Sequence, residues 1–452
     1  MSGSAARLGG YQLDDPTLPA PDRVLTAARA WTGVRGELVE QAAVVVQGGA
    51  IAWVGPRSLL PEVYAGLPVE PHPEATILPG LIEVHAHLGG FAYESRPDVP
   101  DPARHDPAWH ALGSVTVARQ LASVGVTTVQ SLGARHFADV ALREAIDRGL
   151  VEGPRIVASG PQLTTTGGHA WATGGEVDSI TDIRRRIRDH HKAGVDTIKV
   201  MATGGFGTAG SAPWNAQLSQ EELDALVVEA HRLGKTTAAH AHGTQGIERA
   251  VRAGIDLVAH ASFINAEGVT EFDPRLADAL AEAGTFVDTC SPPSHPAVPG
   301  ETATPRAKQL FDHGVRLVTG HDIGAVLPAS GYLFGLRQLE ESGIPVEDVL
   351  LAATSSAAAA VGLAGVTGVL RPGYAADLIV VAGDPLRDLA ALGRLDEVVV
   401  RGHTFRRDPV PPYDPGERGA ERSTGLRRPR SGLEAREDRV RRQARAATHP
   451  GA

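Results

Sequence analysis

Short apolar runs broken by glycine characterise the two ends of the folded part of the chain. They occupy residues 23–25, 43–46 and 51–54 near the start, and residues 376–381 and 397–400 near the end. Runs this short, separated by turn residues, are typical of antiparallel strands and hairpins. The pattern therefore predicts one small β-sandwich domain composed of residues 22–80 and 365–407.

A different pattern fills residues 81–364, where brief apolar runs alternate with amphipathic stretches of helical period. The predicted strands are residues 82–85, 127–130, 155–158, 197–200, 236–239, 257–259, 285–288 and 316–319, and the predicted helices include residues 114–124, 180–193, 219–233, 244–253 and 274–283. Several helices end at a glycine, the residue favoured at a helix C-terminus. Eight strand–helix units in series predict an α/β fold, a (β/α)₈ TIM barrel, and fit an open doubly wound sheet less well.

The two termini differ in composition from the rest. Residues 1–21 are expected to be an N-terminal extension. After residue 407 the chain is rich in proline, glycine, arginine and glutamate, and residues 417–445 hold ten arginines against five acidic residues. We expect residues 408–452 to be a mostly disordered basic tail.

Composition narrows the class of protein. The 452 residues carry a net charge of −10, which argues against nucleic acid as a partner. Cys290 is the only cysteine, so no intramolecular disulfide can form, and its place in a proline-rich loop predicts a thiol without a catalytic role. The sequence has neither a signal-peptide pattern nor an apolar stretch approaching about 20 residues. A soluble cytoplasmic protein without a membrane partner is expected.

Ligand-type side chains recur where the predicted parallel strands end. They are His85 and His87 at the first strand, Lys199 at the fourth, His240 and His242 at the fifth, His260 at the sixth and Asp322 after the eighth. Residues two apart on a strand point to the same face, as two ligands of one metal must. A single histidine at a strand end is commonly an ordinary residue at the rim of a barrel. Because the strand ends of a barrel all meet at one opening, several ligand-type residues at these ends together predict a metal site. Imidazole and carboxylate donors suit zinc or another first-row divalent ion.

Lys199 is unusual because lysine is rare in this chain. The chain has 43 lysines and arginines, of which only four are lysine, so arginine is its usual surface cation. A lysine at the end of an apolar strand therefore calls for a specific role.

These motifs, taken in order, resemble those of a known family. They are LPGLIEVHAHLGG (78–90), GVTTVQSLG (125–133), TTTGGHA (164–170), DTIKVMATGG (196–205), TTAAHAHGTQGIERAVRAGIDLVAHASF (236–263), TGHDIG (319–324) and GVLRPGYAADLIVVAGDPL (368–386). The chain resembles the amidohydrolase superfamily, in its imidazolonepropionase-like and prolidase-like branch. The resemblance spans residues 22–407 and leaves the substrate open.

The resemblance implies a role for each ligand-type residue. His85 and His87 would bind a buried first metal, and His240 and His260 a second. Lys199, carboxylated by carbon dioxide, would bridge the two. The cofactors would be two zinc ions, with a single zinc or manganese, cobalt or iron as alternatives. Asp322 would contact the first metal and act as general base and then as proton donor.

The fifth strand leaves one choice open. His240 ends the apolar run and has the family's spacing to His260, so it is favoured as the ligand. His242 is then a substrate contact or a simple rim residue. His169, in a glycine-rich loop, resembles a substrate-binding residue, and an ordinary loop histidine is an equal alternative.

Three features depart from the family pattern. Glu83 precedes the HxH motif where relatives usually have aspartate, and His321 precedes Asp322 where many have a small polar residue. Gln130 and Ser131 replace a commoner Arg-Asp pair. These changes bear on substrate and rate and leave the ligand positions intact.

The resemblance implies an amidohydrolase that cleaves amide or dipeptide-like C–N bonds of a small molecule with metal-activated hydroxide. The alternative is a hydrolase of cyclic amides, imidazolones or lactones at the same centre. A catalytically silent scaffold is the least favoured, since all six ligand positions hold competent residues. An even-numbered homo-oligomer is compatible with the resemblance.

Overall fold

The computed structural model describes residues 7–8, 11–12, 20–88, 106–290 and 305–413. Most of the predicted N-terminal extension, and the predicted tail from residue 414 onward, lie outside these residues. Within the described ranges, no helix combines the length and the apolar character that crossing a membrane requires.

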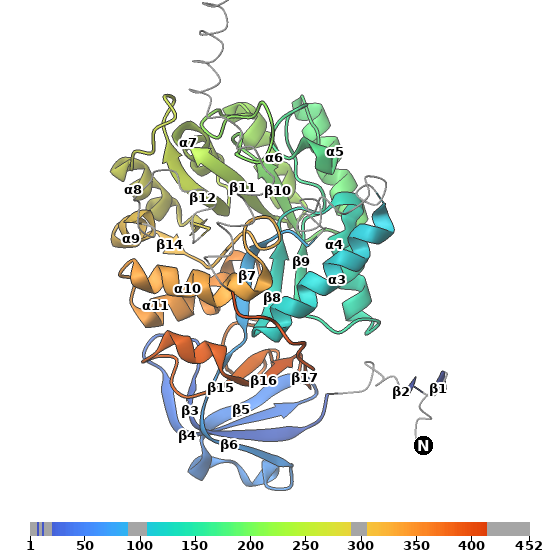
Figure 1. Cartoon of the computed structure of the whole chain (residues 1–452), viewed down its shortest axis with the longest axis vertical. Coiled ribbons are helices and arrows are strands. Elements are labelled where there is room, and N and C mark those ends of the chain that lie inside the picture. The colour runs from blue at the N-terminus through green and yellow to red at the C-terminus, as the bar shows by residue number, and fades with distance from the viewer. Residues whose placement is uncertain (1–6, 9–10, 13–19, 89–105, 291–304, 414–452) are drawn as a thin grey trace, which may run out of the picture.

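One sheet unites strands from both ends of the chain, as the apolar runs predicted (Figure 1). Its order is β17-β16-β15-β6-β3-β4-β5. The strands are β3 (Arg23–Trp31), β4 (Leu38–Gln47), β5 (Ala50–Pro56), β6 (Val69–Pro79), β15 (Leu378–Ala382), β16 (Leu395–Val400) and β17 (His403–Thr404). Two short helices, η1 (Arg57–Leu59) and η2 (Glu62–Tyr64), follow β5, and η6 (Leu389–Gly393) lies between β15 and β16.

Hydrogen bonds join all seven strands into one sheet, and the predicted β-sandwich stays a prediction. The side chains of β15 alternate between two hydrophobic cores, so both faces of this strand are buried. Leu378 and Val380 pack into a core within the sheet domain, whereas Ile379 and Val381 belong to the large core of the rest of the molecule. Since successive side chains of a strand point to opposite faces, this strand serves both cores.

Strands β1 (Arg7–Leu8) and β2 (Tyr11–Gln12) form an antiparallel pair of their own. The other strands form two parallel sheets, of order β7-β8-β9 and β10-β11-β12-β13-β14. The strands are β7 (Leu81–Ala86), β8 (Val126–Ser131), β9 (Arg155–Ala158), β10 (Thr197–Met201), β11 (Thr236–Gly243), β12 (Leu257–Ile264), β13 (Phe286–Asp288) and β14 (Arg316–Leu317). All eight predicted strands are present, so the predicted α/β class is confirmed.

Helices alternate with these strands and cover them from outside (Figure 1). They are α3 (Pro107–Ser123), α4 (Ala138–Asp147), α5 (Ile180–Ala193), α6 (Gln220–Arg232), α7 (Thr244–Ala253), α8 (Pro274–Ala283), α9 (Pro305–Asp312), α10 (Tyr332–Glu341), α11 (Val346–Ala352) and α12 (Ser355–Ala360), with the short helices η3 (Arg135–Phe137), η4 (Trp171–Thr173) and η5 (Ala329–Gly331) between some of them. The N-cap serines Ser179 and Ser219 begin α5 and α6.

A few backbone hydrogen bonds, with isolated parallel bridges between Leu163 and Val200 and between Ala86 and Ile323, extend the pairing beyond the two parallel sheets. The Leu163 N–H donates to the Lys199 carbonyl, which ties the segment after β9 to β10. The Val84 N–H donates to the Thr319 carbonyl, which ties β7 to the segment after β14. The ladders themselves remain separate sheets.

Strands β11 and β12 run four and five residues further than the apolar pattern predicted, to Gly243 and Ile264. Their pairing shifts register between Ala241 and Gly243. These extensions carry His240, His242 and His260 inside strands.

Candidate metal centre

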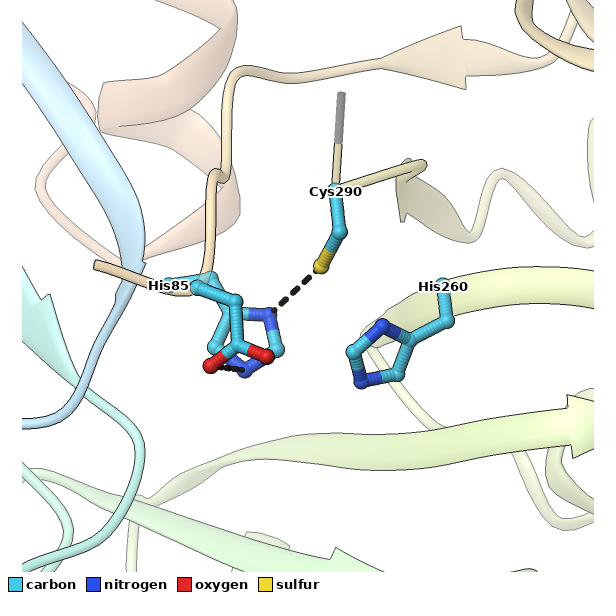
Figure 2. A group of neighbouring side chains, drawn as sticks. His85, His260 and Cys290 are labelled. Atoms are coloured by element: carbon cyan, nitrogen blue, oxygen red, sulfur yellow. Dashed lines mark hydrogen bonds and ion pairs between the residues drawn. The ribbon is translucent and has the colours of Figure 1, made fainter. Parts of the chain in front are cut away.

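Four buried side chains with metal-binding atoms meet at the C-terminal ends of the parallel strands. His85, His260, Cys290 and Asp322 each offer a ligand atom, and these atoms all lie within 4.8 Å of one another. His85 comes from β7, His260 from β12 and Cys290 from just after β13 (Figure 2). Asp322 comes from the loop after β14. Residues from both parallel sheets therefore converge here.

Three histidines form a second group beside the first. Ligand atoms of His240, His242 and His260 lie within 4.8 Å of one another. The Nε2 atom of His240 is 3.0 Å from the Gly204 carbonyl oxygen, to which it donates, so Nδ1 keeps its lone pair. Because His260 is common to both groups, the two candidate positions adjoin.

His242 lies close enough to be a ligand as well as a neighbour. Its Nδ1 is 2.8 Å from the Ser262 hydroxyl oxygen, and its ring stacks on His260 with centroids 4.3 Å apart. The geometry brings both His240 and His242 to the same group, so the choice between them stays a prediction.

Lys199 is buried at the centre without an ordinary partner. It is 1% exposed, and its Nζ atom makes no hydrogen bond to the described residues. Burial away from water lowers the pKa of its amine to about 8, although neighbouring acidic groups oppose this. A buried ammonium without a hydrogen-bond partner is costly, so the neutral fraction of this amine is larger than that of an exposed lysine.

Asp322 faces both histidines of the HxH motif. Its Oδ1 atom is 2.9 Å from Nε2 of His87 and 3.6 Å from Nε2 of His85. Burial alone would raise the pKa of this carboxyl, but the two histidines outweigh it and hold the pKa below its usual range. Asp322 is therefore ionised at neutral pH in the metal-free protein.

A buried carboxylate ties these ligand-bearing segments together. One Glu83 oxygen accepts hydrogen bonds from the backbone N–H groups of His85, at 2.7 Å, and His321, at 2.9 Å. The other accepts from His321 Nδ1 at 2.6 Å. Glu83 and His321, the two residues that depart from the family pattern, therefore contact each other. This contact aligns the backbone of the HxH motif with the residue before Asp322.

Two residues of this centre were not predicted from the sequence as part of it. Asp288 accepts a hydrogen bond from His85 Nδ1 at 2.7 Å, which leaves Nε2 of His85 free to bind a metal. Cys290, expected to be a loop thiol without a role, is 1% exposed with its sulfur 3.3 Å from His85 Nδ1. Asp288 ends the seventh strand, and that position was the available signal.

His169 lies at the edge of the centre. Its ring is 4.5 Å from that of His240, centroid to centroid, and its Nδ1 is 3.1 Å from the Thr208 hydroxyl. Phe206 packs edge-on against His242 at 5.0 Å. Of the two predicted substrate-binding residues, His242 therefore belongs to the second histidine group and His169 borders it.

Comparison with known proteins shows to which protein family this chain is similar. Residues 76–405 match the amidohydrolase family. Ochratoxinase from Aspergillus niger is 28% identical over 390 residues, which cover 78% of this chain and 80% of that protein. Imidazolonepropionase from Maricaulis maris (strain MCS10) is 27% identical over 400 residues, 79% of this chain and 92% of that protein. The crystal structure of a Xaa-Pro dipeptidase with bound methionine in the active site superposes with a TM-score of 0.75, at 25% identity, over 85% of this chain and all of that one.

The chain belongs to the amidohydrolase family, since the match spans most of its length. The predicted class, a hydrolase of C–N bonds, is thereby confirmed at the level of the family. Enzymes of this family are generally metal-dependent and act on small molecules. Its structural relatives imply a TIM-barrel-like fold with an additional domain.

Proposed function

We propose that this protein hydrolyses an amide or dipeptide-like bond of a small molecule at a centre formed by His85, His87, Lys199, His240, His260 and Asp322. The observation that carries the proposal is the convergence of His85, His260 and Asp322 within 4.8 Å beside a second histidine group. Converging imidazoles and a carboxylate, drawn from separate strand ends, are what a catalytic metal site requires.

The donor set fits divalent metal ions, and zinc is the ion we propose. The buried lone pairs support this, since His260 Nδ1 makes no hydrogen bond within the described structure. We assign His85, His87 and Asp322 to one ion and His240 and His260 to a second. Such ions, when bound, polarise a carbonyl and lower the pKa of water toward about 7.

Lys199 supports a bridging carbamate. With a pKa of about 8, roughly one amine in ten is neutral at pH 7, against about one in three thousand at the ordinary value. A neutral amine attacks carbon dioxide, forming a C–N bond and releasing a proton, and the product is an anionic carbamate. This exchanges a buried cation for a ligand, which removes the repulsion that an ammonium would exert on metal ions.

Different side chains of the chain would transfer the proton, contact the substrate and position the ligands. Asp322, held ionised by His85 and His87, takes the proton of the attacking water and delivers it to the leaving nitrogen. His169 and His242 border the reacting atoms and would contact the substrate. Asp288 and Glu83 keep His85 in position by accepting from its ring and its backbone.

Replacement of Asp322 by asparagine tests this role. Asp322 has a left-handed backbone, with φ of 54°, which asparagine tolerates better than most residues, so Asp322→Asn should fold normally. Loss of the proton acceptor should lower kcat about 10²- to 10⁴-fold on N-acyl amino acids or dipeptides. Circular dichroism and metal content serve as controls. A folded, fully metallated Asp322→Asn protein with unchanged kcat would refute the mechanism.

A second candidate is the opening of cyclic amides, imidazolones or lactones, which the similarity to imidazolonepropionase favours. Parallel assays of dipeptides, N-acyl amino acids and cyclic amides separate the two, because the preferred class should show the higher kcat/KM. A protein that binds no metal and stays inactive with added zinc would instead be a silent scaffold.

We also propose how the parts are organised. The two parallel sheets are two arcs of a (β/α)₈ barrel within residues 81–364, supported by the hydrogen bonds that link β9 to β10 and β7 to the segment after β14. Residues 22–80 and 365–407 form the second domain, supported by the sheet that they share.

A further inference from the structure

The one cysteine of the chain lies inside the candidate metal centre. Its sulfur is 3.3 Å from Nδ1 of His85 and 3.4 Å from Oδ2 of Asp288. Within the group of four ligand atoms it is the only sulfur, alongside His85, His260 and Asp322. Figure 2 shows the Cys290 side chain directed toward the imidazole of His85, with the His260 ring beside it. The sulfur lies on the Nδ1 side of the His85 ring, and it is within 4.8 Å of one ligand atom each of His260 and Asp322, close enough to share a metal ion with them.

A second side chain of this group, His260, also points to a bound ligand at this place. His260 is 4% exposed, and its Nδ1 atom makes no hydrogen bond to any described residue. Buried imidazole nitrogens nearly always find a partner, so an orphaned one needs an explanation. Its ring lies within the group that includes Cys290, which makes a bound ion the natural partner.

The backbone holds the thiol in this orientation. Cys290 has a left-handed conformation, with φ of 47°, which L-residues adopt rarely. The Asp288 carboxylate fixes it by accepting from the Cys290 N–H at 2.7 Å. Strained conformations of this kind persist where the surrounding structure imposes them, and they cluster at functional sites.

The charges around the thiol favour a cation. The buried carboxylates of Asp288 and Asp322 both lie near it, at 0% and 8% exposure. Two buried carboxylates beside a thiol form a surrounding in which a divalent ion is stabilised and a thiolate, paired with that ion, becomes tolerable.

We propose that Cys290 is an additional, thiolate ligand of the centre, and that it gives this centre a preference for thiophilic divalent ions such as zinc and cadmium. The inference rests on the metal centre of the proposed function and names a ligand that the proposed set lacks. On binding, the S–H bond breaks, an S–metal bond forms, and one proton is released to solvent. Thiolate ligands select soft metals over manganese and magnesium.

Cadmium loading of the full-length protein tests this directly. The protein is stripped with a chelator, reloaded with Cd²⁺, and its ultraviolet spectrum is compared with that of the Mg²⁺-treated protein. Because the chain has a single cysteine, any thiolate-to-cadmium charge-transfer band must come from Cys290. We expect this band to grow with bound cadmium and to saturate at one cadmium–thiolate bond per chain. Stoichiometric cadmium without the band would overturn the proposal and leave Cys290 as a hydrogen-bond donor to Asp288.

Two variants sharpen the result. Cys290→Ser and Cys290→Ala should both lose the band, and cadmium affinity should fall at least about tenfold, while manganese affinity changes less. Equal losses for both metals would indicate a structural role and contradict the preference. If the variants do not fold, the spectrum of the unmodified protein still decides. Failure of the proposed function is a separate outcome: it would appear as metallated protein, with the band, that hydrolyses no C–N substrate.

Discussion

At the residue scale, the hydrogen bonds of the Glu83 carboxylate hold the backbone at His85 and His321, next to the candidate ligands. The carboxylate is fully buried and accepts from two backbone N–H groups and from the His321 ring. Glu83→Ala would leave these donors unsatisfied in the interior, so we expect a loss of about 3–5 kcal/mol in the free energy of unfolding, measured by urea denaturation.

The matched control is Glu83→Gln. Its amide oxygen can still accept from the backbone N–H groups of His85 and His321, so we expect it to lose clearly less stability than Glu83→Ala. Equal losses in the two variants would show that the second carboxylate oxygen, which accepts from His321 Nδ1, contributes the stability, rather than the space filled or the backbone hydrogen bonds.

Residue types at the centre were foreseeable, whereas their partners were not. His85, His240 and His260 stand out because they follow apolar strands. The partner of His85, Asp288, is 203 residues away, and no local pattern specifies that contact. The same holds for Glu83 and His321, 238 residues apart, which appeared in the sequence as two unrelated departures.

At the element scale, the end of β12 departs from regular strand geometry from the candidate ligand His260 onward. His260, Ala261 and Phe263 have positive φ, with Ala261 at 43°. Left-handed geometry costs an L-residue about 1–2 kcal/mol and costs glycine nothing. We therefore expect Ala261→Gly to be less destabilising than Ala259→Gly by about 1 kcal/mol.

Ala259 is a matched control because it is buried in the same strand and loses the same methyl group. It differs in lying within the regular ladder, between His240 and Asp288. The urea midpoints of the two variants, at equal m-values, give the comparison. A larger loss for Ala261→Gly than for Ala259→Gly would show that this backbone conformation carries no strain.

The strands with the largest boundary errors are those that hold the ligands. Polarity after Ala239 and Ala259 was interpreted as the end of each strand. In the structure both continue, because their polar side chains are buried against partners such as Ser262 and the Gly204 carbonyl. By contrast, α5, α7 and α8 matched their predicted bounds, since caps and apolar period are local signals.

At the scale of the whole molecule, the composite sheet was predictable and its pairing was not. The apolar runs at both ends of the chain predicted strands, and Figure 1 shows these strands in one sheet. β3 pairs in parallel with β6, and β6 pairs antiparallel with β15, and both pairings depend on contacts between distant segments. The same reason explains why eight strands were foreseen while closure of the two parallel sheets into a barrel remains a proposal.

A metal centre at this place should stabilise the entire molecule. Its proposed ligands come from β7, β10, β11, β12 and the loop after β14, so ions bound there would join both parallel sheets. Ligands that bind only the folded state stabilise it by mass action, by about 4 kcal/mol at a thousandfold excess over Kd. We expect chelation to lower the melting temperature by several degrees and zinc to restore it.

Two histidine variants make the chelation experiment specific. His260→Ala removes a residue shared by both candidate groups and should clearly reduce the response to chelator. His313→Ala removes a histidine that pairs with Asp278 at the surface, away from the centre, and should preserve the response in full. Differential scanning calorimetry with metal analysis of each sample provides the measurement. Complete removal of metal without a change in melting temperature would mean that the ions do not hold the two sheets together.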